Sequence, residues 1–223
     1  MRASRLRDFQ THCPYCLMRR EICICPILPA VKTKTEFLIL RHIWEVRRPG
    51  NTGRLVALAM PNSRIIDCGG GERVGSSFLK DKGLTDNETW LLWPDGHALR
   101  HDTPDTRPPQ RVVVLDATWH QARRLFRQNP LLQTMPRLSL PAPSRERRRL
   151  RKQQRPDGMS TLECVAAAVA LLEGDETARP LEHLFDEVVR RKINMRWGNK
   201  HFPDQSESSR SEAFEAISRV NGG

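Results

Sequence analysis

The segment from Arg111 to Arg124, RVVVLDATWHQARR, constrains the fold more than any other part of this 223-residue chain. Residues 112–115 form a continuous aliphatic run, which predicts a β-strand buried on both faces. The run stops at Asp116, and a helical pattern follows that ends at Asn129-Pro130. Open parallel sheets bind their ligands at the carboxyl ends of the strands. Asp116 is therefore either the cap of the helix or a functional carboxylate.

Strand-like and helix-like segments alternate along the rest of the chain. Apolar runs predict further strands at residues 36–40, 63–67, 89–94 and 137–140. Helical patterns stand near residues 55–60, 120–128, 164–174 and 181–191. This alternation predicts an α/β fold with a mainly parallel sheet.

Four of the six cysteines lie close together near the amino terminus, as a C-x2-C pair followed by a C-x-C pair. Four soft thiolates in a short segment supply the ligands of a tetrahedral zinc site. A redox C-x-x-C is the alternative, but such a motif has no use for the second pair. We therefore expect residues 1–34 to form a segment that binds structural zinc. The expected ligands are Cys13, Cys16, Cys23 and Cys25.

The net charge of +11 favours a polyanionic partner, most often nucleic acid. The densest basic run is residues 144–155, SRERRRLRKQQR, in which a single Glu offsets the cations. Such a run can be a solvated helix face, but its self-repulsion favours contact with an RNA backbone. The expected contacts are Arg145, Arg147, Arg148, Arg149, Arg151 and Lys152.

No apolar run reaches eighteen residues, so we expect no membrane span. The amino-terminal residues lack the apolar region of a secretory signal, and a cytoplasmic protein is the default expectation.

Residues 35–198 are expected to form the α/β domain. The polar residues 199–223 are expected to form a disordered tail.

Further polar residues stand where a strand ends or a helix starts. His42 follows the first strand, and Asn51 and Arg54 stand at the start of the next helix, where exposed amides bind anions. Arg54 opposes the helix dipole and therefore needs another reason to be there. Ser160 and Glu163 have the spacing of a capping box, which by itself explains both.

Together these motifs resemble the DTW-domain family, whose Asp-x-Thr-Trp signature stands here as residues 116–119, DATW. The resemblance runs from Cys13 to Arg191. It also takes in residues 121–123, the four cysteines, His42 with Glu45, residues 51–54 and residues 160–163. Cys164 replaces the usual alanine after the glutamate, and Ile43 stands where a proline often follows the histidine.

The resemblance implies a tRNA-uridine aminocarboxypropyltransferase, related to the knotted SPOUT methyltransferase fold. Such an enzyme moves the 3-amino-3-carboxypropyl group of S-adenosylmethionine to N3 of a tRNA uridine. It implies that Asp116 is the catalytic carboxylate, either as the base or hydrogen-bond acceptor at N3 or as the anchor of the cofactor's ammonium group. Trp119 is expected to stack on the adenine or the uracil, or else to fill the core.

The implied ligand contacts fall into two groups. The residues expected to bind the cofactor are Leu115, Asp116, Thr118, Trp119, Ser160, Thr161, Leu162 and Glu163. The residues expected to bind tRNA, beside the basic run, are His42, Asn51, Arg54 and Arg123. The two arginines among them are candidates for a tRNA phosphate or for the cofactor carboxylate.

Two other functions fit part of the pattern. A non-catalytic RNA-binding zinc protein would explain the charge and the cysteines, but not a carboxylate at a strand end beside two polar helix starts. A SPOUT-type RNA methyltransferase would bind the same cofactor, and the mass of the modified tRNA separates the two transfers. The sequence leaves open which tRNA and which uridine are modified, and whether the protein is a monomer or a homodimer.

Overall fold

The structure is a computed structural model that describes residues 10–69, 88–94, 107–141 and 158–196. The basic run 144–155, with all six of its expected RNA contacts, lies outside these residues, and so does the expected tail 199–223.

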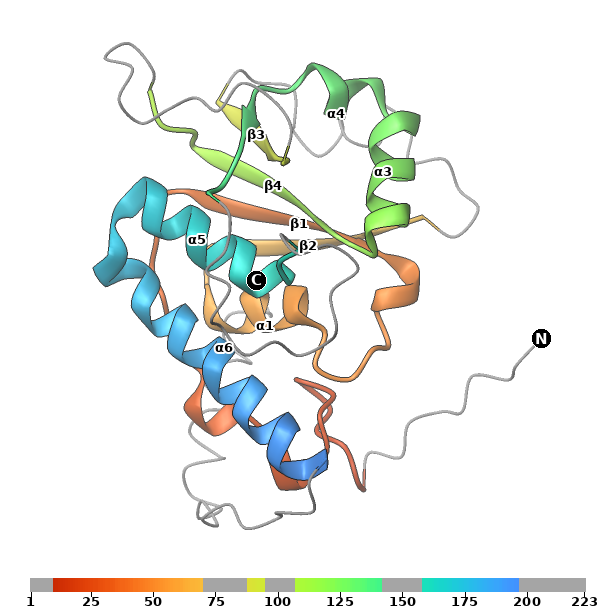
Figure 1. Cartoon of the computed structure of the whole chain (residues 1–223), viewed down its shortest axis with the longest axis vertical. Coiled ribbons are helices and arrows are strands. Elements are labelled where there is room, and N and C mark those ends of the chain that lie inside the picture. The colour runs from red at the N-terminus through yellow and green to blue at the C-terminus, as the bar shows by residue number, and fades with distance from the viewer. Residues whose placement is uncertain (1–9, 70–87, 95–106, 142–157, 197–223) are drawn as a thin grey trace, which may run out of the picture.

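A five-stranded sheet forms the centre of the molecule (Figure 1). Its strands are β1 (Glu36–His42), β2 (Ser63–Cys68), β3 (Thr89–Leu92), β4 (Arg111–Asp116) and β5 (Arg137–Leu138). They lie in the order β2-β1-β4-β3-β5, and every pair among them is parallel. The predicted α/β class with a parallel sheet is confirmed.

Helices cover both faces of this sheet (Figure 1). One face carries α1 (Thr52–Ala59), α5 (Thr161–Glu173) and α6 (Asp175–Arg196), and the other carries α3 (Trp119–Gln128) and α4 (Pro130–Thr134). Short 3-10 turns are η1 (Arg20–Ile22), η2 (Cys25–Ile27) and η3 (Ile43–Glu45). Within the described residues, no helix combines the length and the apolarity that a membrane span requires.

The aliphatic runs of β1 and β4 divide their side chains between two cores. Phe37 and Ile39 of β1 pack toward α1 and α5, whereas Leu38 and Leu40 pack with residues of α3. This alternation follows from the two-residue period of a strand, and it explains why both strands are apolar without interruption. The side chain of Asp116 continues the α1 and α5 side of β4, two residues beyond Val114.

The connections after β1 and β4 leave in opposite directions. From β1 the chain passes through α1 to β2 on one side, and from β4 it passes through α3 and α4 to β5 on the other. β1 and β4 are neighbours, so their carboxyl ends form the topological switch point of the sheet. Ligands of open α/β sheets bind at this position.

Several element boundaries differ from the sequence expectation. The last helix was expected at residues 181–191, but α6 already starts at Asp175 and contains Pro180 in its second turn. The chain also forms the short helix α4 directly after Asn129, with Pro130 as its first residue. The strands expected at 89–94 and 137–140 end two residues earlier, at Leu92 and Leu138.

Candidate active site

The carboxylate of Asp116 lies at the switch point and is held by two helix starts. Its Oδ2 accepts a hydrogen bond of 2.7 Å from Nδ2 of Asn51, which precedes α1. Its Oδ1 accepts one of 2.6 Å from the hydroxyl of Thr161, the first residue of α5. The residue is only 4% exposed. Asp116 is therefore a fixed, buried carboxylate, and the cap of α3 is a different residue, Thr118.

Local capping explains why both helices start at this carboxylate. The side chain of Asn51 accepts from the backbone N–H of Arg54 and so caps α1, while its amide remains free to donate to Asp116. Ser160 and Glu163 form the predicted capping box at the start of α5. The positive ends of both helix dipoles meet at Asp116 and stabilise a negative charge there.

Gly53 brings the first turn of α1 against the carboxylate. A Cβ added at this residue would lie 2.5 Å from Oδ2 and 2.6 Å from Cγ of Asp116. Any side chain at position 53 would therefore push Asp116 and α1 apart. In the sequence this glycine is only one member of a motif, because its role depends on a neighbour 63 residues later in the chain.

Arg41 is a site residue that the sequence analysis missed. It follows the apolar part of β1, and the sheet register pairs it with Asp67 of β2 on one side and with Asp116 of β4 on the other. Its guanidinium donates to both oxygens of Asp67, at 2.7 and 3.1 Å. The Nη1 of Arg41 is buried without a hydrogen-bond partner in the described part of the chain, and the residue is 6% exposed. Arg41, Asp67 and Asp116 are far apart in the sequence, and they become neighbours because their strands lie side by side in the order β2-β1-β4.

Burial dominates the electrostatics of Asp116. It raises the pKa of the Asp116 carboxyl above the ordinary value, and the hydrogen bonds from Thr161 and Asn51 and the charge of Arg41 offset part of this rise. A carboxylate with a raised pKa is a better proton acceptor than an ordinary aspartate.

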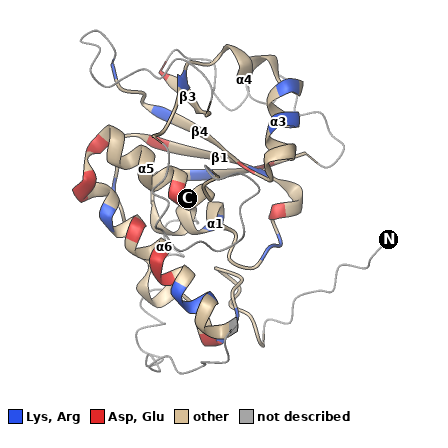
Figure 2. Cartoon of the chain, in the orientation of Figure 1, with Lys and Arg blue, Asp and Glu red and all other residues tan. Residues whose placement is uncertain are grey.

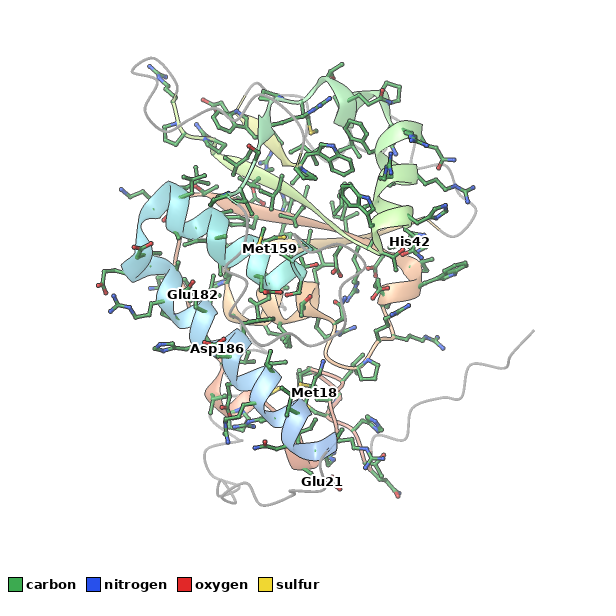
Figure 3. The ribbon with its side chains drawn as sticks, in the orientation of Figure 1. Met18, Glu21, His42, Met159, Glu182 and Asp186 are labelled. Atoms are coloured by element: carbon green, nitrogen blue, oxygen red, sulfur yellow. The ribbon has the colours of Figure 1, made fainter. Side chains whose placement is uncertain are left out.

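His42 lies at the same edge of the sheet, one residue beyond Arg41 (Figure 3). Its Nδ1 accepts a hydrogen bond of 3.2 Å from the backbone N–H of Trp44. Gly69, with a positive φ of 88°, lies directly against the imidazole, where a Cβ would be 2.9 Å from the ring. Burial and the positive charge of Arg124 lower the pKa of His42, which favours the neutral ring.

The remaining residues of the DATW motif lie on the α3 side of the sheet. Thr118 caps α3 in a capping box with Gln121. The ring of Trp119 stacks on Trp93 at 5.2 Å, and the guanidinium of Arg123 lies 5.9 Å from the Trp119 ring centre. Leu115 also packs with this second core, whereas Leu162 is buried in the first. Of the predicted residues, Asn51 and Thr161 contact the Asp116 carboxylate, and Ser160 and Glu163 cap the same helix start as Thr161. The side chains of Leu115, Thr118, Trp119 and Arg123 lie on the α3 side of the sheet.

Arg54 is occupied by backbone carbonyls. Its Nη2 donates to the carbonyl of Val46 at 2.7 Å, and its Nη1 donates to that of Tyr15 at 3.5 Å. These bonds tie α1 to the loop after η3 and to the N-terminal segment. These two hydrogen bonds explain, without any bound ligand, why an arginine occurs in the first turn of α1.

The four N-terminal cysteines form one cluster whose ligand sulfurs all lie within 4.8 Å of one another. The Sγ atoms of Cys13 and Cys25 are 3.6 Å apart, and those of Cys16 and Cys23 are 3.8 Å apart. A tetrahedral zinc ion with Zn–S bonds of about 2.3 Å would separate its sulfurs by about 3.8 Å. Hydrogen bonds from the other three thiols, led by Cys16, lower the pKa of Cys13. The donor set and its spacing fit a zinc ion.

This cysteine cluster is packed on the rest of the protein. Its buried residues belong to the same core as those of α1, α5 and α6. Arg191 of α6 donates to the carbonyl of Cys23, and Lys192 donates to that of Gly50. Figure 3 shows Met18 of this segment beside the C-terminal half of α6. The cluster thus supports the loop that leads into α1 and the Asp116 site.

The chain matches the model of a known protein family over most of its length. The model of the DTW domain matches residues 10–193. This chain belongs to the DTW domain family. The motifs assembled around Asp116 and the four cysteines all lie within the matched residues.

Curated relatives of this DTW protein carry one common name. The chain is 28% identical to tRNA-uridine aminocarboxypropyltransferase 2 of Mus musculus over 190 residues, 77% of this chain and 61% of that protein. It is 26% identical to tRNA-uridine aminocarboxypropyltransferase 2 of Macaca fascicularis over 207 residues, 85% of this chain and 67% of that protein. It is 29% identical to tRNA-uridine aminocarboxypropyltransferase A of Arabidopsis thaliana, over 52% of this chain and 50% of that protein. The chain thus spans about three-fifths of the mouse relative's length. No solved structure matches it.

Proposed function

We propose that this DTW protein transfers the 3-amino-3-carboxypropyl group of S-adenosylmethionine to N3 of a uridine in tRNA. Family membership and the shared name of the curated relatives support the activity. The observation that carries it is the buried carboxylate of Asp116, at the switch point of the sheet and between two helix starts. A pure RNA-binding protein has no need of such a carboxylate.

The reaction requires a group that removes the weakly acidic proton from uridine N3. When bound, S-adenosylmethionine would supply the electrophile, the side-chain methylene carbon bonded to its sulfonium, so the N3–C bond would form as that C–S bond breaks and 5′-methylthioadenosine would leave as the neutral thioether. In this proposal Asp116 accepts the N3 proton, and the carboxylate fits that task because burial raises its pKa. Each of its oxygens accepts one hydrogen bond in the structure and keeps a second lone pair for the substrate. Its alternative role is to hold the ammonium of the cofactor's amino acid part.

Arg41 supports the choice of cofactor. The transferred group carries a carboxylate, and a buried guanidinium with an unused donor is the partner that a carboxylate needs. Nη1 of Arg41 is such a donor, and Asp67 fixes the rest of the guanidinium beside the Asp116 strand. We therefore assign the cofactor carboxylate to Arg41. The start of α5, residues 160–163, would form the wall of the pocket beside it.

The tRNA would contact the basic residues of the chain. Arg123 is exposed on α3, and the run 144–155 adds the largest block of positive charge in the sequence. Neutralising phosphates with these side chains releases counterions, so tRNA binding should weaken steeply with salt. A flat response to salt would argue against the basic run as the tRNA contact.

The rest of the proposed organisation follows from the family. The four cysteines hold structural zinc in residues 1–34, residues 35–198 form the catalytic domain, and residues 199–223 form a tail. We further propose a cytoplasmic protein with a SPOUT-like fold, which the parallel sheet supports. The knot stays a prediction, because the internal segments 70–87, 95–106 and 142–157 lie outside the described residues.

Mass spectrometry of tRNA incubated with the protein and S-adenosylmethionine tests the function. The expected product is a uridine that carries the aminocarboxypropyl group. A methylated nucleoside would instead assign a methyltransferase. Absence of any product, together with tRNA binding but no binding of S-adenosylmethionine, would assign a non-catalytic RNA-binding protein.

A further inference from the structure

A tryptophan beside the candidate active site is turned out into solvent. Trp44 is 71% exposed and its neighbour Ile43 is 42% exposed, and these are the large exposed hydrophobic residues of the described chain. Both belong to η3, which follows β1 directly at the carboxyl edge of the sheet. Trp is highly buried on average, so two adjacent exposed hydrophobic residues beside the candidate site are a starting point for a contact surface, which needs further support.

The structure holds this indole in place. His42 accepts the backbone N–H of Trp44, and the two rings meet edge to face with their centres 5.5 Å apart. Glu45, the next residue, is buried and pairs with Arg48 at 3.0 Å. Trp44 is therefore presented by an anchored turn, and little side-chain entropy is lost when its exposed face is covered.

Basic side chains lie near the turn that carries the indole. Arg124 of α3 acts electrostatically on His42, and Arg47 is exposed three residues beyond Trp44. Figure 2 shows Lys and Arg on α3 and on the segment that follows η3, and residues of both signs along α6. Glu45 of η3 is the acidic residue nearest in sequence to Trp44, and it is buried and paired with Arg48. An aromatic face among cations is the combination that binds single-stranded nucleic acid, through base stacking and phosphate contacts. A second copy of this chain would bring like charges together, so it is a poor partner for the surface.

We propose that Trp44 stacks on an unpaired base of the tRNA, next to the uridine that enters the Asp116 site. The placement follows from the register: Arg41 pairs with Asp116 across β1 and β4, and Trp44 comes three residues later on the same edge. The target uridine must leave its stack to expose N3 to Asp116, and the indole replaces the lost stacking for its neighbour. This inference rests on the proposed tRNA substrate.

Two substitutions separate stacking from simple apolar contact. Trp44→Leu keeps apolar bulk and removes the aromatic face, whereas Trp44→Phe keeps a smaller one. With the full-length protein at fixed salt, we expect Trp44→Leu to weaken tRNA binding at least about fivefold and Trp44→Phe to recover most of the loss. The slope of affinity against salt should not change, because no phosphate contact is lost. Affinity for S-adenosylmethionine should also stay at the wild-type value.

Every other outcome overturns the inference. Wild-type tRNA affinity in Trp44→Leu, or equal losses in both variants, would exclude stacking. A changed oligomeric state with unchanged tRNA affinity would assign the surface to a protein contact. The experiment also distinguishes failure of the stacking proposal from failure of the proposed tRNA-modifying function. A wild-type protein that makes the expected product while Trp44→Leu binds tRNA normally refutes only the stacking, and a wild-type protein that does not bind tRNA refutes both.

Discussion

Replacing Gly53 by alanine tests the packing that holds Asp116. The added Cβ would lie 2.5 Å from Oδ2 of Asp116, and real Cβ atoms essentially never come within 3.0 Å of another atom. Both groups are packed on all sides, so the carboxylate or the first turn of α1 must move by about half an ångström. The bond between Asn51 and Asp116, 2.7 Å long, lies directly in the path of that movement.

We expect Gly53→Ala to destabilise the protein, whereas the same substitution at an ordinary helical glycine stabilises it. Glycine to alanine in a helix usually gains about 1 kcal/mol. Overpacking a close-packed site costs about 1–3 kcal/mol, so we expect a net loss of up to about 2 kcal/mol. For a domain of this size each kcal/mol lowers Tm by roughly 2–4 °C. A shift of about 1 Å in a reacting group can cost about 100-fold in rate, so turnover should fall by about 10- to 100-fold.

The assay compares Tm with turnover on tRNA, and Gly174→Ala is the matched control. Gly174 has a positive φ of 91° and no atom within 4 Å of its added Cβ. Alanine there should lose stability through backbone strain, roughly 1–3 kcal/mol, because φ 91° with ψ 160° is a region that essentially only glycine adopts, but it should keep full turnover per folded molecule. A Gly53→Ala protein that is more stable than the wild type and fully active would refute the reasoning.

Three further predictions concern the metal, the cofactor and pH. Cys16→Ser should lose bound zinc, measured by elemental analysis, and unfold at a lower temperature; unchanged metal content would contradict a four-cysteine site. Arg41→Gln should weaken S-adenosylmethionine binding by about tenfold or more in calorimetry while tRNA affinity stays constant. Unchanged S-adenosylmethionine affinity with weakened tRNA binding would exclude the contact between Arg41 and the cofactor carboxylate. Burial raises the pKa of Asp116 in the folded chain, so the folded state keeps the proton to higher pH than the unfolded state does. The wild type should therefore lose stability relative to Asp116→Asn as pH rises from the ordinary aspartate range through the raised pKa. Urea unfolding at several pH values measures this, and a constant difference would contradict a raised pKa.

Periodicity and capping rules predicted much of this fold from the sequence. The aliphatic runs of β1 and β4 are unambiguous because both strands are buried on both faces. The capping box at Ser160 is a local pattern, so the start of α5 was predicted correctly. The start of α1 was predicted only to within one residue, since Asn51 and Thr52 were both possible caps, and the structure selects Asn51. The start of the last helix was predicted six residues too late, because the apolar pattern begins only at Leu181, whereas α6 starts at Asp175. A proline near the start of a long helix, such as Pro180, disturbs few of its hydrogen bonds.

The contacts of the candidate site depend on strand order and could not be predicted. Nothing local to Arg41 indicates that Asp67 and Asp116 lie on either side of it. Gly53 likewise acts on a distant carboxylate, and Arg54 is used by the carbonyls of Val46 and Tyr15. Each of these contacts joins residues that are far apart in sequence or separated by an irregular loop, where periodicity carries no information.

The most direct test of the central claim is the mass of tRNA nucleosides after reaction with the wild type and with Asp116→Asn. The amide is nearly isosteric with the carboxylate but cannot accept a proton, so the variant should remain folded. The wild type should convert a uridine to its aminocarboxypropyl derivative, and the variant should form essentially none while still binding tRNA. Product formation by Asp116→Asn at the wild-type rate would contradict the claim that this buried carboxylate carries the chemistry.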